Sequence, residues 1–172
     1  MRVVLIRHAF AGDRDAFART GAPDSERPVT PKGKKHMRRG ARGLRRLVPD
    51  IDRLATSPYR RAMQTARVVA RAYDGLEPLV LDRLIPDVEP AHVARWLRAQ
   101  RGADTIALVG HEPQLSQLAA FLVTAGSAPI LTLEKGAACA IDLAASRTGT
   151  LVWLLTARQL RALGKRKRNS IA

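Results

Sequence analysis

The sequence predicts an α/β fold, a three-layer α/β/α sandwich in which helices cover both faces of a mostly parallel six-stranded sheet. Short apolar, β-branched runs alternate with longer segments that carry apolar residues at helical spacing, and this alternation is typical of parallel sheets. The last two strand-like runs are separated only by the short turn-like link 144–149. They are therefore expected to form an antiparallel hairpin at one edge of the sheet.

The first elements follow from local pattern. The apolar run at residues 3–6 predicts a strand over 2–7. Segment 12–27, rich in Gly, Asp, Ala and Pro, is expected to be a long loop over the functional site. A helix is predicted over 31–48, because one of its faces collects the apolar residues Met37, Ala41, Leu44 and Leu47.

The rest of the chain continues the alternation. Leu115, Leu118 and Leu122 form an apolar face in the segment that follows the β-branched run 105–109, so this segment is predicted to be a helix. In chain order, the remaining elements are a strand 52–56, a helix 58–73, a strand 78–82, a helix 90–100, a strand 105–110, a helix 113–124, strands 138–143 and 150–155, and a helix 157–163.

Four residues are predicted to mark helix ends. Thr30 and Ser57 each precede a proline, so each is expected to act as an N-cap hydroxyl ahead of a residue whose missing N–H costs nothing in the first turn. Gly126 and Gly164 are predicted to stop the helices that precede them.

Length and composition suit one domain. The chain has 172 residues, of which 46% are apolar, so residues 1–164 can fill the core of a single domain. The apolar stretches are too short to span a bilayer, and the N-terminal run ends at Arg7 without the layout of a signal peptide. We therefore expect a cytoplasmic protein with no membrane contact. The single cysteine, Cys139, lies in an apolar stretch and is expected to be a buried structural thiol.

The net charge of +15 predicts an anionic partner. The densest basic block is 32–46, interpreted as a solvated helix face, and residues 165–172 form a basic tail that is expected to be mobile. Both could contact an acidic partner or nucleic acid. Aromatic residues make up only 4% of the chain and do not alternate with these charges, so base stacking gains little support.

Two histidines stand at predicted strand ends. His8 follows Arg7 at the end of the first strand, and His111 follows Gly110 at the end of the strand 105–110. Ligands bind outside the carboxyl ends of parallel strands, so the two imidazoles converge if their strands are neighbours. Arg61 is expected in the first turns of a helix, where the helix dipole already favours an anion. With Arg7 and Arg27 it could supply three guanidinium forks to a phosphoryl group, and its neighbour Arg60 is interpreted as a surface residue.

Five segments of the chain resemble the histidine phosphatase superfamily, whose fold is phosphoglycerate mutase-like. They are LIRH at 5–8, RPVTPKG at 27–33, the segment 56–66 that begins TSP and ends QTA, VGH at 109–111 and LEKGA at 133–137. They occur in the family's order, and the resemblance covers residues 1 to about 155. The nearest resemblance is to the small phosphohistidine phosphatases of the SixA type.

The resemblance implies a covalent mechanism. His8 is then the nucleophile that carries the phosphoryl group as phosphohistidine until water removes it. His111, preferably protonated, would act with Arg7, Arg27 and Arg61 to stabilise the charge on the phosphoryl oxygens. No metal and no cofactor are expected, since protein cations fill that role.

The general acid is the weakest part of the pattern. No glutamate stands where mutase-like relatives use one, and Asp82 and Asp87 are candidate substitutes that could equally be surface acids, with Glu112 a further candidate. Because a P–N bond breaks more readily than a phosphate ester, this gap favours phosphohistidine on a protein, such as a histidine phosphotransfer domain. Two alternatives stay open: a phosphatase of small phosphate esters, and a non-catalytic basic protein that binds polyanions.

Overall fold

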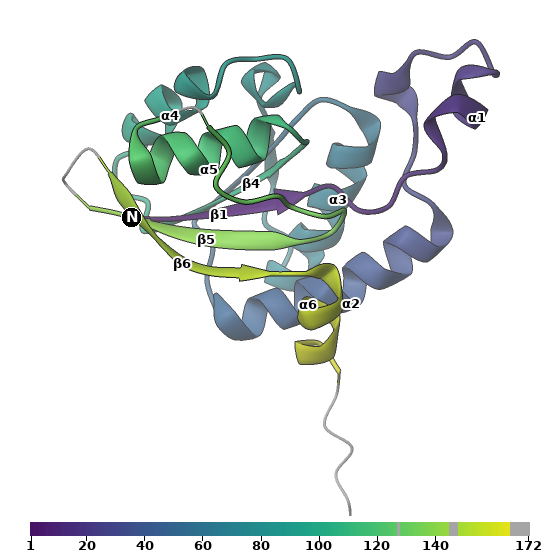
Figure 1. Cartoon of the computed structure of the whole chain (residues 1–172). Coiled ribbons are helices and arrows are strands. Elements are labelled where there is room, and N and C mark those ends of the chain that lie inside the picture. Colours follow the sequence, from purple (N-terminus) through teal and green to yellow (C-terminus); the bar gives the residue numbers. More distant parts are fainter. Residues whose placement is uncertain (127, 145–147, 166–172) are drawn as a thin grey trace, which may run out of the picture.

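The structure, a computed structural model, describes residues 1–126, 128–144 and 148–165. These residues form one sheet with the strand order β3-β2-β4-β1-β5-β6 (Figure 1). The strands are β1 (Arg2–Arg7), β2 (Arg53–Thr56), β3 (Pro78–Val80), β4 (Thr105–Gly110), β5 (Ala138–Leu143) and β6 (Gly149–Leu155). The first four are mutually parallel, whereas β5 runs antiparallel to β1 and to β6. The predicted fold class is therefore confirmed, including the hairpin at one edge.

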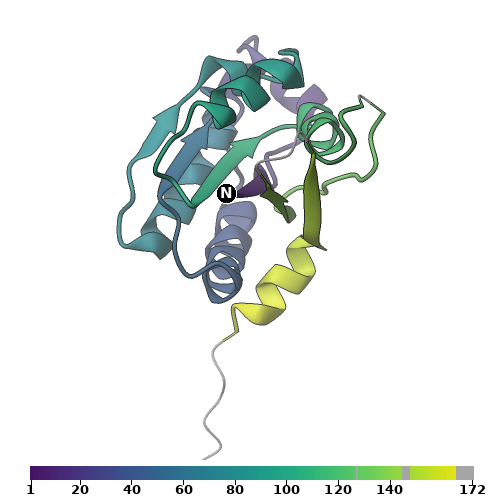
Figure 2. The ribbon, with the colours of Figure 1, turned by 90° about the vertical axis from the view of Figure 1, so that its left-hand side faces the viewer.

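Helices cover both faces of the sheet, as Figure 2 shows from a second direction. One layer contains α2, α3 and α6, and the other contains α4 and α5. The helices are α1 (Arg14–Ala18), α2 (Pro31–Leu47), α3 (Arg60–Ala70), α4 (Pro90–Arg98), α5 (Gln114–Thr124) and α6 (Ala157–Leu163). Three short 3-10 turns are η1 (Asp24–Glu26), η2 (Arg71–Tyr73) and η3 (Asp82–Leu84).

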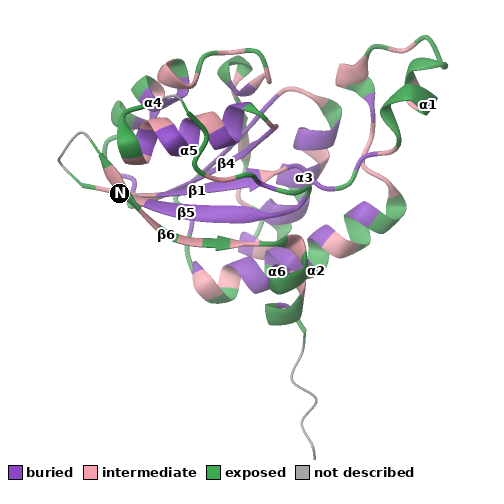
Figure 3. Cartoon of the chain, in the orientation of Figure 1, coloured by how far each residue is buried: buried purple, intermediate pink, exposed green. Residues whose placement is uncertain are grey.

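Two apolar cores lie on the two sides of the sheet. Successive side chains of a strand point to opposite faces, so Val4 and Ile6 of β1 belong to the core under α2, α3 and α6, while Val3 and Leu5 belong to the core under α4 and α5. All four are fully buried, and burying each stabilises the fold by about 1.5–3 kcal/mol. Figure 3 shows this central buried strand between helices that are buried on one side and exposed on the other.

Helices α2 and α6 meet at glycines. A Cβ atom at Gly43 would lie 2.0 Å from the Leu160 carbonyl oxygen, and one at Gly164 would lie 1.9 Å from the Arg39 carbonyl oxygen. The two backbones can therefore approach this closely only because both positions lack a side chain. This contact fixes α6, at the end of the described chain, against the basic helix α2.

The predicted helix ends are right in two cases and wrong in two. Thr30 caps α2 by accepting a hydrogen bond from the Gly33 N–H, and α6 ends at Gly164. Ser57 is not an N-cap: α3 begins two residues beyond the prediction, with Tyr59 at the cap position, and the Ser57 hydroxyl contacts His111 and the Tyr59 N–H. Gly126 does not stop α5, since Ala125 itself adopts the left-handed conformation there.

Several predicted spans need adjustment. The strand 78–82 ends at Val80, and the segment 12–27 is not wholly a loop, because α1 and η1 lie within it. The helix 58–73 divides into α3 and η2. Residues 145–147 of the predicted link and 166–172 of the predicted tail lie outside the described residues. Within the described ranges, no helix is long and apolar enough to cross a membrane.

Candidate active site

The parallel pairing of β1 with β4 brings the two predicted histidines together. Arg7 and Gly110 are register partners, so His8 and His111 leave neighbouring strands at the same edge. The His8 backbone N–H donates to the Gly110 carbonyl oxygen at 3.0 Å, and the two imidazole centroids lie 5.0 Å apart. Both rings are buried, with 4% and 2% of their residue surface exposed. The convergence that depended on strand adjacency is therefore present.

A cavity of about 620 Å³ opens over these rings. Its lining combines basic, acidic and aromatic side chains from segments between residues 7 and 135. Among the lining residues are Arg7, His8, Asp13, Asp24, Arg27, Tyr59, Arg61, Asp87, His111, Glu112 and Lys135. All five predicted catalytic and phosphate-binding residues thus share one cavity.

The backbone assigns the tautomer of His8. Its Nδ1 lies 2.7 Å from the Ala9 carbonyl oxygen, which can only accept, so Nδ1 carries the proton. Nε2 then keeps its lone pair and accepts a hydrogen bond from Arg61 Nε at 3.2 Å. Burial, followed by the charges of Arg61, Arg7 and Arg27, lowers the pKa of His8 to about 3 against the opposing effect of the Ala9 hydrogen bond. His8 is therefore neutral at neutral pH, and Nε2 is the ring nitrogen that carries the lone pair.

Arg61 is held beside His8 by helix α3. It lies in the first turn, is 4% exposed, and its guanidinium lies 5.0 Å from the centroid of the Tyr59 ring. Thr65, one turn later, donates to the Arg61 carbonyl oxygen and accepts from the Ala9 N–H at 3.0 Å. This hydroxyl ties α3 to the segment that carries His8. Arg60 is exposed, in agreement with its predicted place on the surface.

The other two arginines are anchored to backbone carbonyls. Arg27 is 7% exposed and donates from Nη1 to the Gly12 carbonyl oxygen at 2.6 Å. Arg7 donates from Nη1 to the Leu133 carbonyl oxygen at 2.7 Å, and its buried Nε has no hydrogen-bond partner within the described part of the chain. Each guanidinium is thus oriented by a bond to a backbone carbonyl while it keeps further N–H groups for an anion.

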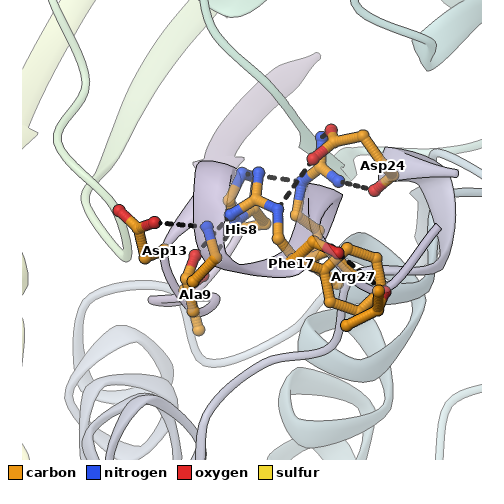
Figure 4. A network of polar contacts seen from close by, with 10 residues as sticks. His8, Ala9, Asp13, Phe17, Asp24 and Arg27 are labelled. Atoms are coloured by element: carbon orange, nitrogen blue, oxygen red, sulfur yellow. Dashed lines mark hydrogen bonds and ion pairs between the residues drawn. The ribbon is translucent and has the colours of Figure 1, made fainter. Parts of the chain in front are cut away.

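Asp24 is the site residue that the sequence analysis missed. Its carboxylate accepts from Arg27 Nε at 2.7 Å and pairs with Arg61 Nη2 at 3.1 Å, and its carbonyl oxygen accepts from Arg61 Nη1. Figure 4 shows this network of polar contacts around His8, Asp24 and Arg27. Burial alone would raise the pKa of the Asp24 carboxyl, but the Arg27 hydrogen bond and the two arginine charges lower it overall. The spacing of Asp24 three residues before Arg27 is the only sign of this pair in the sequence.

His111 is held by Ser57. Its Nε2 lies 2.9 Å from the Ser57 hydroxyl oxygen, and the Tyr59 ring packs edge-on against it with centroids 5.0 Å apart. Its Nδ1 is buried without a hydrogen-bond partner among the described residues. Burial, then the neighbouring His8 and Arg61, lower the pKa of His111 to about 2. The His111 imidazole is therefore neutral before substrate binds, whereas a protonated His111 is expected from the sequence.

The structure separates the candidate acids. Asp87 lines the cavity, whereas Asp82 is exposed at the start of η3 and is not part of the lining. Glu112 also lines the cavity, and its Oε1 accepts from the Leu133 N–H at 3.1 Å. Of the two predicted substitutes for the general acid, only Asp87 is within the site.

The single cysteine and the two remaining histidines lie outside the cavity over His8. Cys139 is fully buried in β5, and burial raises the pKa of its thiol to about 12, in agreement with a structural role. His92 is exposed and His36 is half-buried, and neither lines the cavity over His8. Within the described ranges, no group of three His, Cys, Asp or Glu side chains is arranged to hold a metal ion.

A family model, a curated relative and a solved structure all relate this chain to histidine phosphatases. Residues 3–85 match the model of the histidine phosphatase superfamily (branch 1). An uncharacterised protein of Picosynechococcus sp. is 31% identical over 162 residues, which cover 91% of this chain and 96% of that protein. Phosphohistidine phosphatase SixA of Escherichia coli is 29% identical over 159 residues, or 91% of this chain and 94% of that protein. A solved structure of the protein histidine phosphatase SixA with tungstate superposes with a TM-score of 0.78 and 29% identity, covering 93% of this chain and 99% of that one.

Proposed function

The chain belongs to the histidine phosphatase superfamily, in its SixA-type branch, and from this premise we propose that it removes the phosphoryl group from phosphohistidine on a protein. The observation that carries this proposal is the neutral His8, whose Nε2 lone pair accepts a hydrogen bond from Arg61. The centroid of its ring lies 5.0 Å from that of His111. The phosphoprotein substrate is suggested by the names of the SixA relatives and by the lowered pKa of Asp24, the carboxyl group that contacts two of the arginines.

In the first step, the lone pair of His8 Nε2 attacks phosphorus in line. A new P–N bond forms as the bond from phosphorus to the leaving group breaks, and the leaving group takes the bonding electron pair and a proton from solvent. Arg7, Arg27 and Arg61 stabilise the phosphoryl oxygens because their guanidinium groups are fixed before substrate arrives. Arg61 must give up its contact with Nε2 for that atom to react.

Ser57 and His111 support the same transfer. The Ser57 oxygen lies 3.3 Å from the Tyr59 N–H, from which it accepts, so its own hydrogen can be donated to His111 Nε2. Nδ1 of the neutral His111 then carries a proton and can donate it to a phosphoryl oxygen. The neutral His111 can thus donate a hydrogen bond to the phosphoryl group as it arrives. Once that negative group is bound, it favours protonation of the His111 ring.

In the second step, water attacks phosphorus. The bond to His8 Nε2 breaks, the electron pair returns to the imidazole, and inorganic phosphate leaves with the oxygen of water, whose protons stay on the phosphate or pass to solvent. The Ala9 carbonyl keeps the proton on Nδ1 throughout, so the ring returns to the same neutral tautomer.

The leaving group distinguishes the substrates. An imidazole is basic enough to be protonated by solvent, so cleavage of phosphohistidine does not require a carboxylic acid from the protein. Asp24, the acid that contacts both Arg27 and Arg61, has a lowered pKa and is therefore a poor proton donor. As far as Asp24 is concerned, the site therefore favours a P–N bond over an alkyl ester, whose leaving oxygen needs a proton.

The experiment compares a phosphohistidine-bearing protein with an aryl phosphate, using wild type and His8→Ala. Fast His8-dependent release from the phosphoprotein with slow ester hydrolysis is the expected result. Fast hydrolysis of the ester alone would replace the proposal with a phosphatase of small esters. No His8-dependent release from either substrate would favour the polyanion-binding alternative.

Asp87 supports the small-ester function as a second candidate, because it lines the cavity and could protonate an ester oxygen. If it does so, Asp87→Asn lowers turnover of an alkyl phosphate about 100-fold and spares phosphohistidine. Asp82→Asn serves as the matched control, because Asp82 lies outside the cavity lining.

A further inference from the structure

A second cavity, of about 600 Å³, lies beside the catalytic one. The two share Arg7, Phe10 and Lys135 in their linings, so they are neighbouring cavities. We call the second cavity the basic groove. Its charged and titratable lining residues beyond Arg7 are Lys32, His36, Glu134, Lys135, Arg158 and Arg161.

Three separate segments bring these cations together. Lys32 and His36 belong to α2, Lys135 follows Leu133, and Arg158 and Arg161 belong to α6. The glycine contact of α6 with α2 and the hydrogen bond from the Ala157 N–H to Glu134 Oε1, 2.8 Å long, fix their relative positions. The groove is therefore a product of the fold and does not follow from the basic block 32–46 alone.

The positive charge of the groove is not neutralised from within. None of the ion pairs among the described residues involves Lys32, Lys135, Arg158 or Arg161, and Glu134 is the one acid in the groove lining. Partial burial, followed by the charges of Arg7, Arg27 and Arg61, lowers the pKa of Lys135. The catalytic cavity differs, because four carboxylates contribute to its lining.

We infer that the basic groove binds the carboxylates of an acidic protein segment that flanks the phosphorylated residue of the substrate. This inference rests on the proposed function, since it places the phosphoryl group over His8 and the acidic side chains next to it on the same polypeptide. Cations outside the ion pairs of the described residues attract such a segment, and the two cavities adjoin at the shared Arg7 and Lys135, so one polypeptide can reach both.

A protein segment fits the groove better than nucleic acid does. Phe10 is the one aromatic residue in the groove lining, and the Lys135 ammonium lies 4.9 Å from the centroid of its ring. Single-stranded nucleic acids bind through several aromatic platforms on which successive bases stack. Carboxylates need only cations, which Lys32, Arg158 and Arg161 supply within one cavity.

The test measures binding separately from turnover. A fluorescent peptide in which glutamates alternate with glycines is titrated into the full chain at low ionic strength, beside the same peptide with glutamines. The matched variants are Arg158→Glu/Arg161→Glu in the groove and Arg38→Glu/Arg42→Glu on the exposed part of α2 outside it, which change the net charge equally. Aryl phosphate hydrolysis is followed in each variant.

The groove variant is expected to raise the Kd of the glutamate peptide about tenfold, while the control raises it less than threefold. Aryl phosphate hydrolysis should stay within twofold in both. Equal weakening by the two variants would overturn the inference, because net charge alone would then explain binding. Single-stranded RNA that binds tighter than the peptide, and loses its affinity in the groove variant, would also overturn it. Absence of hydrolysis by wild type would instead count against the proposed phosphatase function, because peptide binding is measured independently of hydrolysis.

Discussion

Replacement of Arg61 by lysine tests whether guanidinium geometry, and not charge alone, supports the reaction. Arg61 contacts His8 Nε2 through Nε at 3.2 Å and reaches the Asp24 backbone and carboxylate through its two other nitrogens. Lysine keeps the charge but has one nitrogen, so it cannot replace a planar fork. At 4% exposure the side chain is shielded, and water cannot easily substitute for the lost donors.

The magnitude follows from the number of bonds lost. One missing charge-assisted hydrogen bond to the phosphoryl group costs about 1.5–3 kcal/mol. Since each 1.36 kcal/mol of transition-state stabilisation is a factor of ten, kcat/KM should fall about 10- to 150-fold in Arg61→Lys.

The assay is steady-state hydrolysis of an aryl phosphate together with inhibition by inorganic phosphate. Arg60→Lys is the control, because Arg60 is adjacent but exposed, and its kcat/KM should stay within about twofold of wild type. Circular dichroism confirms that both variants are folded. A value for Arg61→Lys within threefold of wild type would refute the argument from guanidinium geometry.

Three further predictions concern the second histidine, acid stability and helix packing. Ser57→Ala should lower kcat about 3- to 10-fold, because His111 loses the hydroxyl that fixes its tautomer, and ¹⁵N NMR of His111 should show a mixture of tautomers; an unchanged spectrum contradicts this. The pKa values of about 3 for His8 and about 2 for His111 lie below the ordinary 6.5, so below pH 6.5 the unfolded chain takes up protons that the folded chain does not. The free energy of unfolding should therefore fall by about 2 kcal/mol per histidine between pH 7 and pH 5, and denaturant titration of His8→Asn should show a smaller fall; equal slopes would count against burial of a neutral ring. Gly43→Ala should lower Tm because its Cβ would lie 2.0 Å from the Leu160 carbonyl oxygen, whereas Gly40→Ala, with 3.9 Å to its nearest neighbour, should leave Tm unchanged or raise it; the reverse order would contradict the glycine contact.

The sheet could be predicted because its strands carry a strong local pattern. Val3 to Ile6 are apolar and buried on both faces, which is the pattern of a central parallel strand, and the helix between each pair of runs sets the direction of the next strand. The positions of His8 and His111 at strand ends follow from the same pattern. Their 5.0 Å separation does not, because it depends on β1 and β4 being neighbours, which periodicity does not determine.

The parts of the site that could not be predicted depend on tertiary contacts. Ser57 reads as a helix cap in the sequence, and only the neighbouring strand β4 brings His111 to its hydroxyl. Asp24 reads as one acid in a polar segment, and its role as partner of Arg27 and Arg61 requires that segment to fold back over α3. The low pKa of His111 likewise arises from burial, which the sequence around it does not reveal.

The most direct test of His8 as the nucleophile is to trap the phosphorylated enzyme. Wild type is mixed with a phosphohistidine-bearing protein, quenched in alkali within one turnover, digested and analysed by mass spectrometry and ³¹P NMR. Acid-labile phosphate is expected on His8 at Nε2, because Nδ1 carries a proton that is hydrogen-bonded to the Ala9 carbonyl oxygen. Phosphate on another residue or on Nδ1, or turnover by His8→Ala at the wild-type rate, would contradict it.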